Sequence, residues 1–138
     1  MAMAIPFKHV TDDAMLDRIA RQVAEYRWPR TPAGASWPQG ADPATMRYIV
    51  QRWRDGFDWR AQEARLNERP QFQASVADLR LHFVHQRAAA KAERLPVLLM
   101  HGWPGCYLEY LDVADRLVAA GHDAVVVSLP GAGHSDAP

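Results

Sequence analysis

The 138-residue sequence has a single cysteine, Cys106, and no excess of charge of either sign. One cysteine cannot form an internal disulfide, which excludes the disulfide-stapled secreted scaffolds and fits a reducing compartment. Sixteen basic residues balance sixteen acidic residues. This balance gives no support to a nucleic-acid or membrane-surface partner, because both favour basic proteins.

Long hydrophobic runs are also missing from the sequence. No apolar stretch approaches the roughly 20 residues that cross a bilayer, and Pro6 interrupts the N-terminus too early for a signal peptide. We therefore expect a soluble, cytoplasmic protein. Hydrophobic residues make up 49% of the chain and charged residues 23%, which is ordinary for a globular domain.

Groups of metal ligands are missing as well. His82 and His85 lie three residues apart on an expected strand, and this spacing places them on opposite faces. His122 and His134 have no carboxylate or cysteine at ligand spacing. We predict no metal site and no cofactor. The tryptophans at 28, 37, 53 and 59 are interpreted as packing residues rather than a cofactor site.

The first 70 residues have the apolar spacing of helices. Thr11 is expected to cap a first helix over 12–27, whose apolar face holds Leu16, Ile19, Ala20 and Val23. Asp42-Pro43 predicts the start of a second helix that ends near Gly56. A third helix is predicted over 59–67. Residues 30–42, rich in proline and glycine, are predicted to form a loop.

From residue 71 the apolar spacing changes to alternation. Two alternating runs, over 72–76 and 79–85, flank a turn at Asp78 and predict a β-hairpin. The polar, Ala-rich stretch 88–94 is expected to be a mobile connection. The first 70 residues thus form one predicted region, and residues 71–138 form another.

The last part of the chain predicts a strand–helix–strand unit. An apolar strand over 95–100 enters a Gly/Pro loop, and a helix continues to about residue 120, where Gly121 ends it. The β-branched run at 125–127 is typical of a central parallel strand. The predicted fold class is therefore α/β: a helical N-terminal region followed by a hairpin and a right-handed strand–helix–strand crossover.

The loop at the end of strand 95–100 is the candidate functional element. It reads His101-Gly102-Trp103-Pro104-Gly105. Where a strand breaks into a loop and a helix begins, backbone N–H groups point into open space and can hold negative charge that develops on an oxygen.

Two groups of segments resemble a known enzyme family. The N-terminal group, rich in tryptophan, comprises residues 27–29, 37–40, 53–60, 63–67 and 70–72. The second group comprises residues 81–85, 101–105 and 128–131. In this order, and over nearly the whole chain, they resemble the epoxide hydrolases of the microsomal and juvenile-hormone type. The second group resembles the opening of that family's α/β-hydrolase domain.

The resemblance implies hydrolysis of an epoxide to a diol in two steps. A carboxylate attacks an epoxide carbon while two cap-domain tyrosines assist the leaving oxygen, and a histidine with an acidic partner then directs water at the enzyme ester. The resemblance also implies that the backbone N–H of Trp103 is a donor of the oxyanion hole. It implies a cis Trp103–Pro104 bond, and His101, Gly102 and Gly105 would support the turn with Pro104.

The nucleophile, acid and base that the resemblance implies are expected beyond Pro138. The sequence contains no Gly-x-Asp-x-Gly or Gly-x-Ser-x-Gly element, which would present a nucleophile on a strand–turn–helix. We therefore expect a truncated hydrolase sheet that is inactive by itself. Ala132 and His134 stand where the family usually has aromatic residues, which leaves the substrate contacts of their loop open.

Four side chains, three in or beside this loop and one after the final predicted strand, have competing interpretations. His101 is expected to brace the loop through hydrogen bonds rather than act as a base. Trp103 is expected to have two roles: its backbone amide is a donor of the oxyanion hole, and its ring forms part of the pocket wall. The alternative is that Trp103 serves only in packing. Cys106 is interpreted as a small buried residue at a helix start, because no Cys/His pair accompanies it. Asp136 is rejected as a nucleophile, because no strand–turn–helix frames it.

Three hypotheses for function remain open. The first is the N-terminal portion of an epoxide hydrolase, which binds an epoxide only when another segment completes the site. The second is a non-catalytic module for association or small-molecule binding. The third, a dehalogenase or esterase lineage, is disfavoured by the tryptophan pattern. Strand 95–100 is expected to form an open apolar edge, so we expect self-association or a partner that supplies the rest of the fold.

Overall fold

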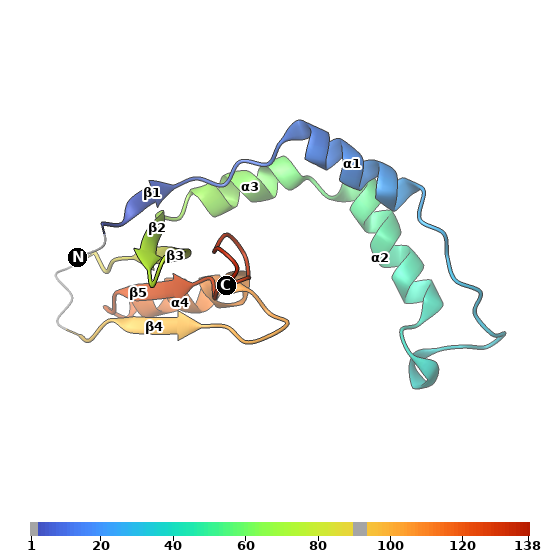
Figure 1. Ribbon diagram of the computed structural model, residues 1–138. Helices are drawn as coiled ribbons and strands as arrows, with labels where there is room; N and C mark the ends of the chain where they lie inside the picture. The colour runs from blue at the N-terminus through green and yellow to red at the C-terminus, as the bar shows by residue number, and fades with distance from the viewer. Residues whose placement is uncertain (1–2, 90–93) are drawn as a thin grey trace. The chain divides into compact units, whose positions relative to one another are not determined.

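The computed structural model describes residues 3–89 and 94–138. The chain forms two units, each with more contacts among its own residues than with the other (Figure 1). The helical unit is Val10–Glu63, and the sheet unit is Met1–His9 together with Ala64–Pro138. Most of the connection that was expected to be mobile, residues 90–93, lies outside the described residues.

The helical unit contains α1 (Asp13–Ala24), a 3-10 turn η1 (Trp37–Gln39) and α2 (Pro43–Gly56), and α3 (Trp59–Asn67) begins in it. The three predicted helices are present, and α1 is shorter than predicted. Asp42 caps α2 as expected, because its carboxylate accepts from the Thr45 amide at 2.7 Å.

The expected cap of α1 at Thr11 is wrong, because Asp12 takes that position. The Asp12 carboxylate accepts from the Ala14 amide at 2.8 Å. The Thr11 hydroxyl instead accepts from the Trp59 indole N–H at 2.8 Å, and the Thr11 amide donates to Glu63 at 2.5 Å. Contacts with residues about 50 positions away therefore outweigh the local capping preference.

The described residues of the sheet unit form five strands in the order β1-β2-β3-β5-β4. The strands are β1 (Ile5–Phe7), β2 (Gln71–Val76), β3 (Leu79–Gln86), β4 (Val97–Met100) and β5 (Ala124–Val127). The predicted hairpin β2–β3 is confirmed. Its two turn residues, Ala77 and Asp78, have φ of 48° and 65°, as a type I′ turn requires. The short β1, which pairs antiparallel with β2, was not predicted.

The strand–helix–strand unit is confirmed, since β4 pairs in parallel with β5. A 3-10 turn η2 (Tyr107–Tyr110) leads into α4 (Leu111–Ala119), so the predicted helix starts with a tighter turn. Gly121 follows α4 with φ of 88°. One face of the sheet packs on α4 and holds the buried core, which comprises Val84, Tyr107, Leu111, Ala114, Ala124 and Val126.

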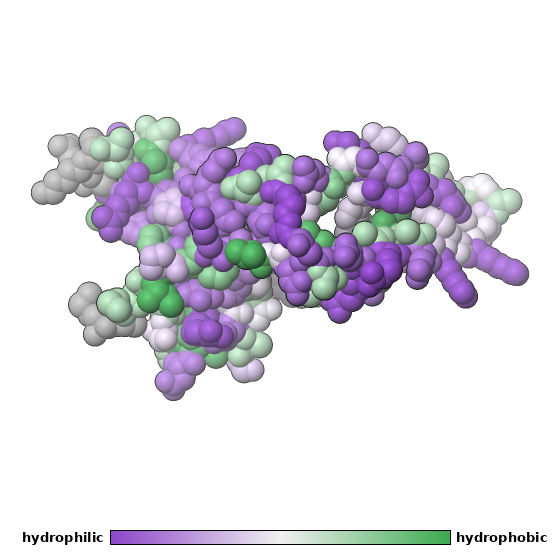
Figure 2. All heavy atoms as spheres, turned by 90° about the horizontal axis from the view of Figure 1, so that it is seen from above, coloured by the Kyte–Doolittle hydropathy of each residue, from purple (hydrophilic) through white to green (hydrophobic). Residues whose placement is uncertain are grey.

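β4 is the last strand in the sheet order, so its outer backbone edge has no strand beside it among the described residues. Leu98 and Met100 lie on the sheet face opposite the core and are 56% and 58% exposed. The surface seen in Figure 2 is mainly hydrophilic, with small separate hydrophobic patches. Among the described residues no helix is long and apolar enough to cross a membrane.

Candidate functional site

The turn that follows β4 carries the candidate oxyanion element. The Gly105 amide donates to the Gly102 carbonyl at 2.7 Å and closes the turn. The Trp103–Pro104 bond is cis, as the resemblance implies. Trp103 is 96% exposed, and its amide donates no hydrogen bond to any residue that the structure describes. The turn therefore leaves one backbone donor open to a ligand.

His101 is buried beneath this turn and is bonded at both ring nitrogens. Its Nε2 accepts from the Leu129 amide at 3.2 Å. Because Nε2 is the acceptor, the ring proton lies on Nδ1, which donates to the Gly102 carbonyl at 3.2 Å. His101 thus connects the loop after β4 with the loop after β5, and these bonds engage both of its ring nitrogens.

The loop after β5 is closed by backbone hydrogen bonds within it, and its Asp136 amide donates to the Arg80 carbonyl on β3 at 2.9 Å. The Gly131 amide donates to the Asp136 carbonyl, and the Ala132 amide to the Leu129 carbonyl, both at 2.9 Å. The Asp136 carboxylate receives the Arg80 guanidinium at 3.0 Å and the Arg80 amide at 3.0 Å. These bonds hold the Asp136 pKa below its usual range. Its carboxylate is engaged in an ion pair.

A network of buried polar side chains lies under this loop, and the sequence patterns do not predict it. His82 has no exposed surface; its Nδ1 lies 2.8 Å from the Ser128 hydroxyl, and its Nε2 lies 2.9 Å from Gln71 Oε1. Burial, then the nearby imidazoles of His134 and His9, lower the His82 pKa to about 4. His82 alternates in phase with the buried Val84. A histidine at such a position needs hydrogen-bond partners, and this signal could have revealed the network.

His134 occupies the position where the family usually has an aromatic residue. Its ring lies 4.5 Å from the His9 ring, 5.0 Å from those of Phe7 and His82, and 5.9 Å from that of Tyr107. Burial lowers its pKa, and so does His9. A neutral imidazole therefore takes the place of an aromatic ring in this cluster.

Cys106 lies directly before η2, at a helix start as expected, but it is partly exposed rather than buried. Its amide donates to the Glu109 carboxylate at 3.1 Å. Among residues 3–89 and 94–138, no group of three or more His, Cys, Asp or Glu side chains is arranged to hold a metal ion.

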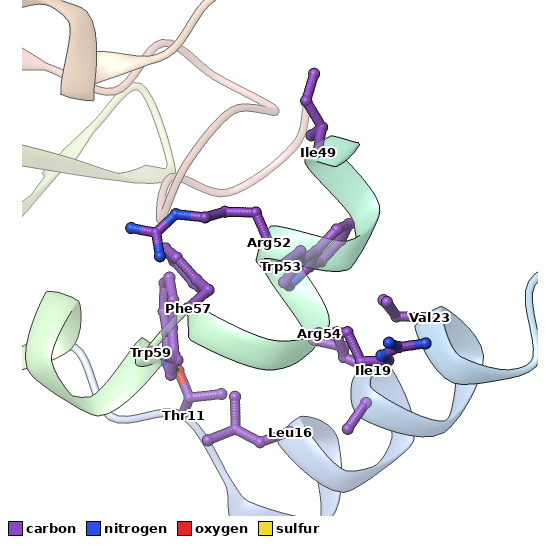
Figure 3. Close-up of a pocket in the computed structure, with 11 residues that line it drawn as sticks. Thr11, Leu16, Ile19, Val23, Ile49, Arg52, Trp53, Arg54, Phe57 and Trp59 are labelled. Atoms are coloured by element: carbon purple, nitrogen blue, oxygen red, sulfur yellow. The ribbon is translucent and has the colours of Figure 1, made fainter. Parts of the chain in front are cut away.

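The helical unit contains an apolar groove of about 710 Å³. Leu16, Ile19 and Val23 line it from α1, and Ile49 and Trp53 from α2 (Figure 3). It is completed by Thr11, Ala20, Arg52, Arg54, Phe57 and Trp59. The lining offers no paired carboxylates or acid–base set.

Two of the four tryptophans at 28, 37, 53 and 59 are exposed. Trp37 is 63% exposed and Trp53 is 48% exposed, so neither packs in a core of the described chain, and their expected packing at an interface stays a prediction. Trp28 is partly buried, and the Arg47 guanidinium lies 4.6 Å from its ring centre.

A family model described as "Epoxide hydrolase N terminus" matches residues 4–110. A candidate epoxide hydrolase of Stigmatella aurantiaca is 35% identical over 96% of this chain and 32% of its own length. Juvenile hormone epoxide hydrolase 2 of Ctenocephalides felis is 28% identical over 96% of this chain and 30% of its own length. The chain thus spans about a third of the length of these curated relatives.

The structure is similar to that of Aspergillus niger epoxide hydrolase, with a TM-score of 0.86 and 28% identity. The similarity covers 99% of this chain and 37% of that enzyme. It includes both the helical part and the sheet, so the predicted α/β fold class is confirmed, and it is the α/β-hydrolase fold.

Proposed function

Because the chain belongs to the epoxide hydrolase N-terminus family, we propose that it supplies the oxyanion-binding loop of an epoxide hydrolase. The reaction in question converts an epoxide and water to a vicinal diol through an ester on an enzyme carboxylate. The observation that carries the proposal is the open Trp103 amide on the turn after β4. Its N–H is a ready donor for the oxygen that becomes negative when water attacks the ester.

The loop is suited to this role because its donor is held in place before any ligand arrives. The Gly105–Gly102 bond closes the turn, and His101 ties the turn to the loop after β5. A donor that needs no reorganisation during the reaction stabilises the transition state far more than a mobile donor does. The loss of one such donor typically lowers kcat by about 10²- to 10³-fold.

The remaining reacting groups must come from residues other than those of this chain. Asp136 is engaged with Arg80, His101 with Leu129 and Gly102, and neither is framed as a nucleophile or base. We therefore propose that the 138-residue chain is inactive alone. A segment carrying the nucleophile, the acid and the base completes the site, whether it continues this chain or belongs to another.

The experiment has two parts. The chain alone is incubated with styrene oxide, and we expect no diol above the buffer rate; turnover would show that the reacting groups are present after all. A chimera in which residues 1–138 replace the matching part of Aspergillus niger epoxide hydrolase is then assayed. We expect diol formation, and a chimera that folds but shows no turnover counts against the proposed role of the loop.

The exposed edge of β4 is the proposed docking place of that completing segment. An open, apolar strand edge is a template for another strand, and the exposed Leu98 lies on it. If a second copy of the chain pairs there instead, the alternative function as an association module is favoured. Light scattering on the chain and on Leu98→Lys separates these cases, with Leu95→Lys, outside β4, as the control. A defined dimer that only Leu98→Lys dissociates supports the module.

A further inference from the structure

Hydrogen bonds connect buried polar side chains across four of the five strands of the sheet unit. The line begins at Gln71 on β2, passes through His82 on β3 and reaches Ser128 at the end of β5. The neighbouring Leu129 amide then donates to His101 at the end of β4. This line ends directly beneath the turn that carries the open amide.

The direction of each bond is fixed by the groups around it. The Gln71 side-chain N–H donates to the Leu66 carbonyl at 2.8 Å, so Gln71 Oε1 is the end that faces His82. Gln71 Oε1 can only accept, and the proton of His82 therefore lies on Nε2. His82 Nδ1 is then an acceptor for the Ser128 hydroxyl. Only one tautomer of His82 satisfies the network.

Ser128 is held at three atoms in addition to its packing. Its hydroxyl donates to His82 Nδ1, its amide donates to the His82 carbonyl at 2.9 Å, and its carbonyl accepts from the Ser135 hydroxyl at 2.6 Å. The Ser135 hydroxyl in turn accepts from the His82 amide at 2.9 Å. Because the amide, side chain and carbonyl of Ser128 are all fixed, the peptide plane between Ser128 and Leu129 is fixed as well. The direction of the Leu129 N–H is therefore set by Ser128.

Gly133 shows how closely the loop packs on Ser128. A Cβ at Gly133 would lie 2.6 Å from the Ser128 hydroxyl, and the residue has φ of 58°. Both the space and the backbone conformation therefore require glycine. The loop after β5 closes directly over the hydroxyl that His82 accepts.

We propose that His82 is a positioning residue for the oxyanion loop, acting through Ser128, Leu129 and His101. It holds Ser128 so that the Leu129 amide meets His101 Nε2, and this bond fixes His101 as the Nδ1–H tautomer that donates to Gly102. His82 and His101 are thus opposite tautomers. The importance of this arrangement for catalysis rests on the proposed function of the loop. The hydrogen bonds and tautomers themselves do not depend on that function.

The test uses NMR on the whole chain labelled with ¹⁵N. We expect the ¹⁵N shifts to show the Nε2–H form for His82 and the Nδ1–H form for His101 at pH 7. In Ser128→Ala, the Leu129 amide is expected to exchange about three- to ten-fold faster, the effect of one net hydrogen bond. His101 is expected to become a mixture of tautomers, while the amides of Val84 and Val126 change less.

Three results would overturn the proposal. One is the opposite tautomer at either histidine in the unmodified chain, a measurement that does not depend on any variant folding. Another is a folded Ser128→Ala in which the Leu129 amide and His101 are unchanged. The third is a loss of protection at Leu129 no larger than that at Val84, which would mean that the network only stabilises the core. None of these readouts involves epoxide turnover, so this proposal and the proposed function fail separately.

Discussion

Lowering the pH from 7 to 5 is expected to destabilise the chain through the buried imidazole of His82. In the folded state its pKa is about 4, chiefly because burial disfavours the charged ring. The ionisable groups around it are His9, His134 and Tyr107, and burial raises the pKa of the Tyr107 phenol to about 12. None of these neighbours carries a negative charge near neutral pH that would favour a protonated His82.

Stability falls with falling pH because the unfolded state binds a proton at His82 at a higher pH than the folded state does. In the unfolded chain a histidine has a pKa near ~6.5, so the unfolded state takes up a proton as the pH falls below that value, while folded His82 stays neutral until about pH 4. The contribution of His82 to the free energy of unfolding is therefore nearly constant above about pH 7 and falls between about pH 6.5 and 4. At pH 5 the loss from His82 amounts to about 2 kcal/mol.

Urea unfolding followed by circular dichroism at pH 7.5, 6 and 5 measures this loss. His82→Gln is expected to flatten the dependence between pH 7 and 5. His134→Gln reports the share of the second histidine, whose pKa is also lowered. A stability that does not change between pH 7 and 5 would refute the reasoning. If His82→Gln does not fold, an NMR titration of the unmodified chain measures the His82 pKa directly. A His82 ring that titrates near pH 6.5 would also refute the reasoning.

Three further outcomes are expected. Ala77→Asn should raise the free energy of unfolding by about 1 kcal/mol, because asparagine tolerates the positive φ of the hairpin turn better than alanine; an unchanged urea midpoint would argue against strain there. Gly102→Ala should leave stability within about 0.5 kcal/mol, since a Cβ there meets no atom within 4 Å. In the active chimera, however, the same variant should lower kcat, because the added methyl lies only three bonds from the Trp103 amide nitrogen and crowds an oxygen bound there. Glu63→Gln should lower stability at pH 7, because hydrogen bonds from Thr11 and then Arg60 hold the Glu63 pKa at about 2. This deficit should shrink as the pH falls from about 5 toward 2, and a deficit that is constant with pH would contradict the assignment.

The elements that the sequence predicts correctly are those specified by local patterns. Asp42-Pro43 predicts the start of α2 because capping and the fixed φ of proline act within one turn. The hairpin follows from alternation on both sides of Asp78. In the same way the apolar run before His101 places the candidate loop at the end of a strand.

What the sequence does not reveal depends on partners far away in the chain. The three residues of β1 are too few for a periodic signal, and they become a strand because β2 lies beside them. Thr11 does not cap α1, because Trp59 and Glu63 bind it. The partners of His82 are 11 and 46 residues away, so local periodicity can show that His82 is buried but not what it binds.

The position of His82 in the core also bears on why a polar side chain is buried there. An apolar residue would fill the same place without the cost of removing a ring with two polar atoms from water. Each hydrogen bond of the network returns only about 1 kcal/mol net, so the network adds little to stability beyond what it costs. A hydrogen bond also has a direction, which apolar contact lacks. Here donation runs from the Ser128 hydroxyl through His82 to Gln71, and the Leu129 amide next to Ser128 donates to His101. The cost of burying His82 is therefore best explained by the orientation it gives to the end of β5, and through Leu129 to His101 and the open amide of Trp103.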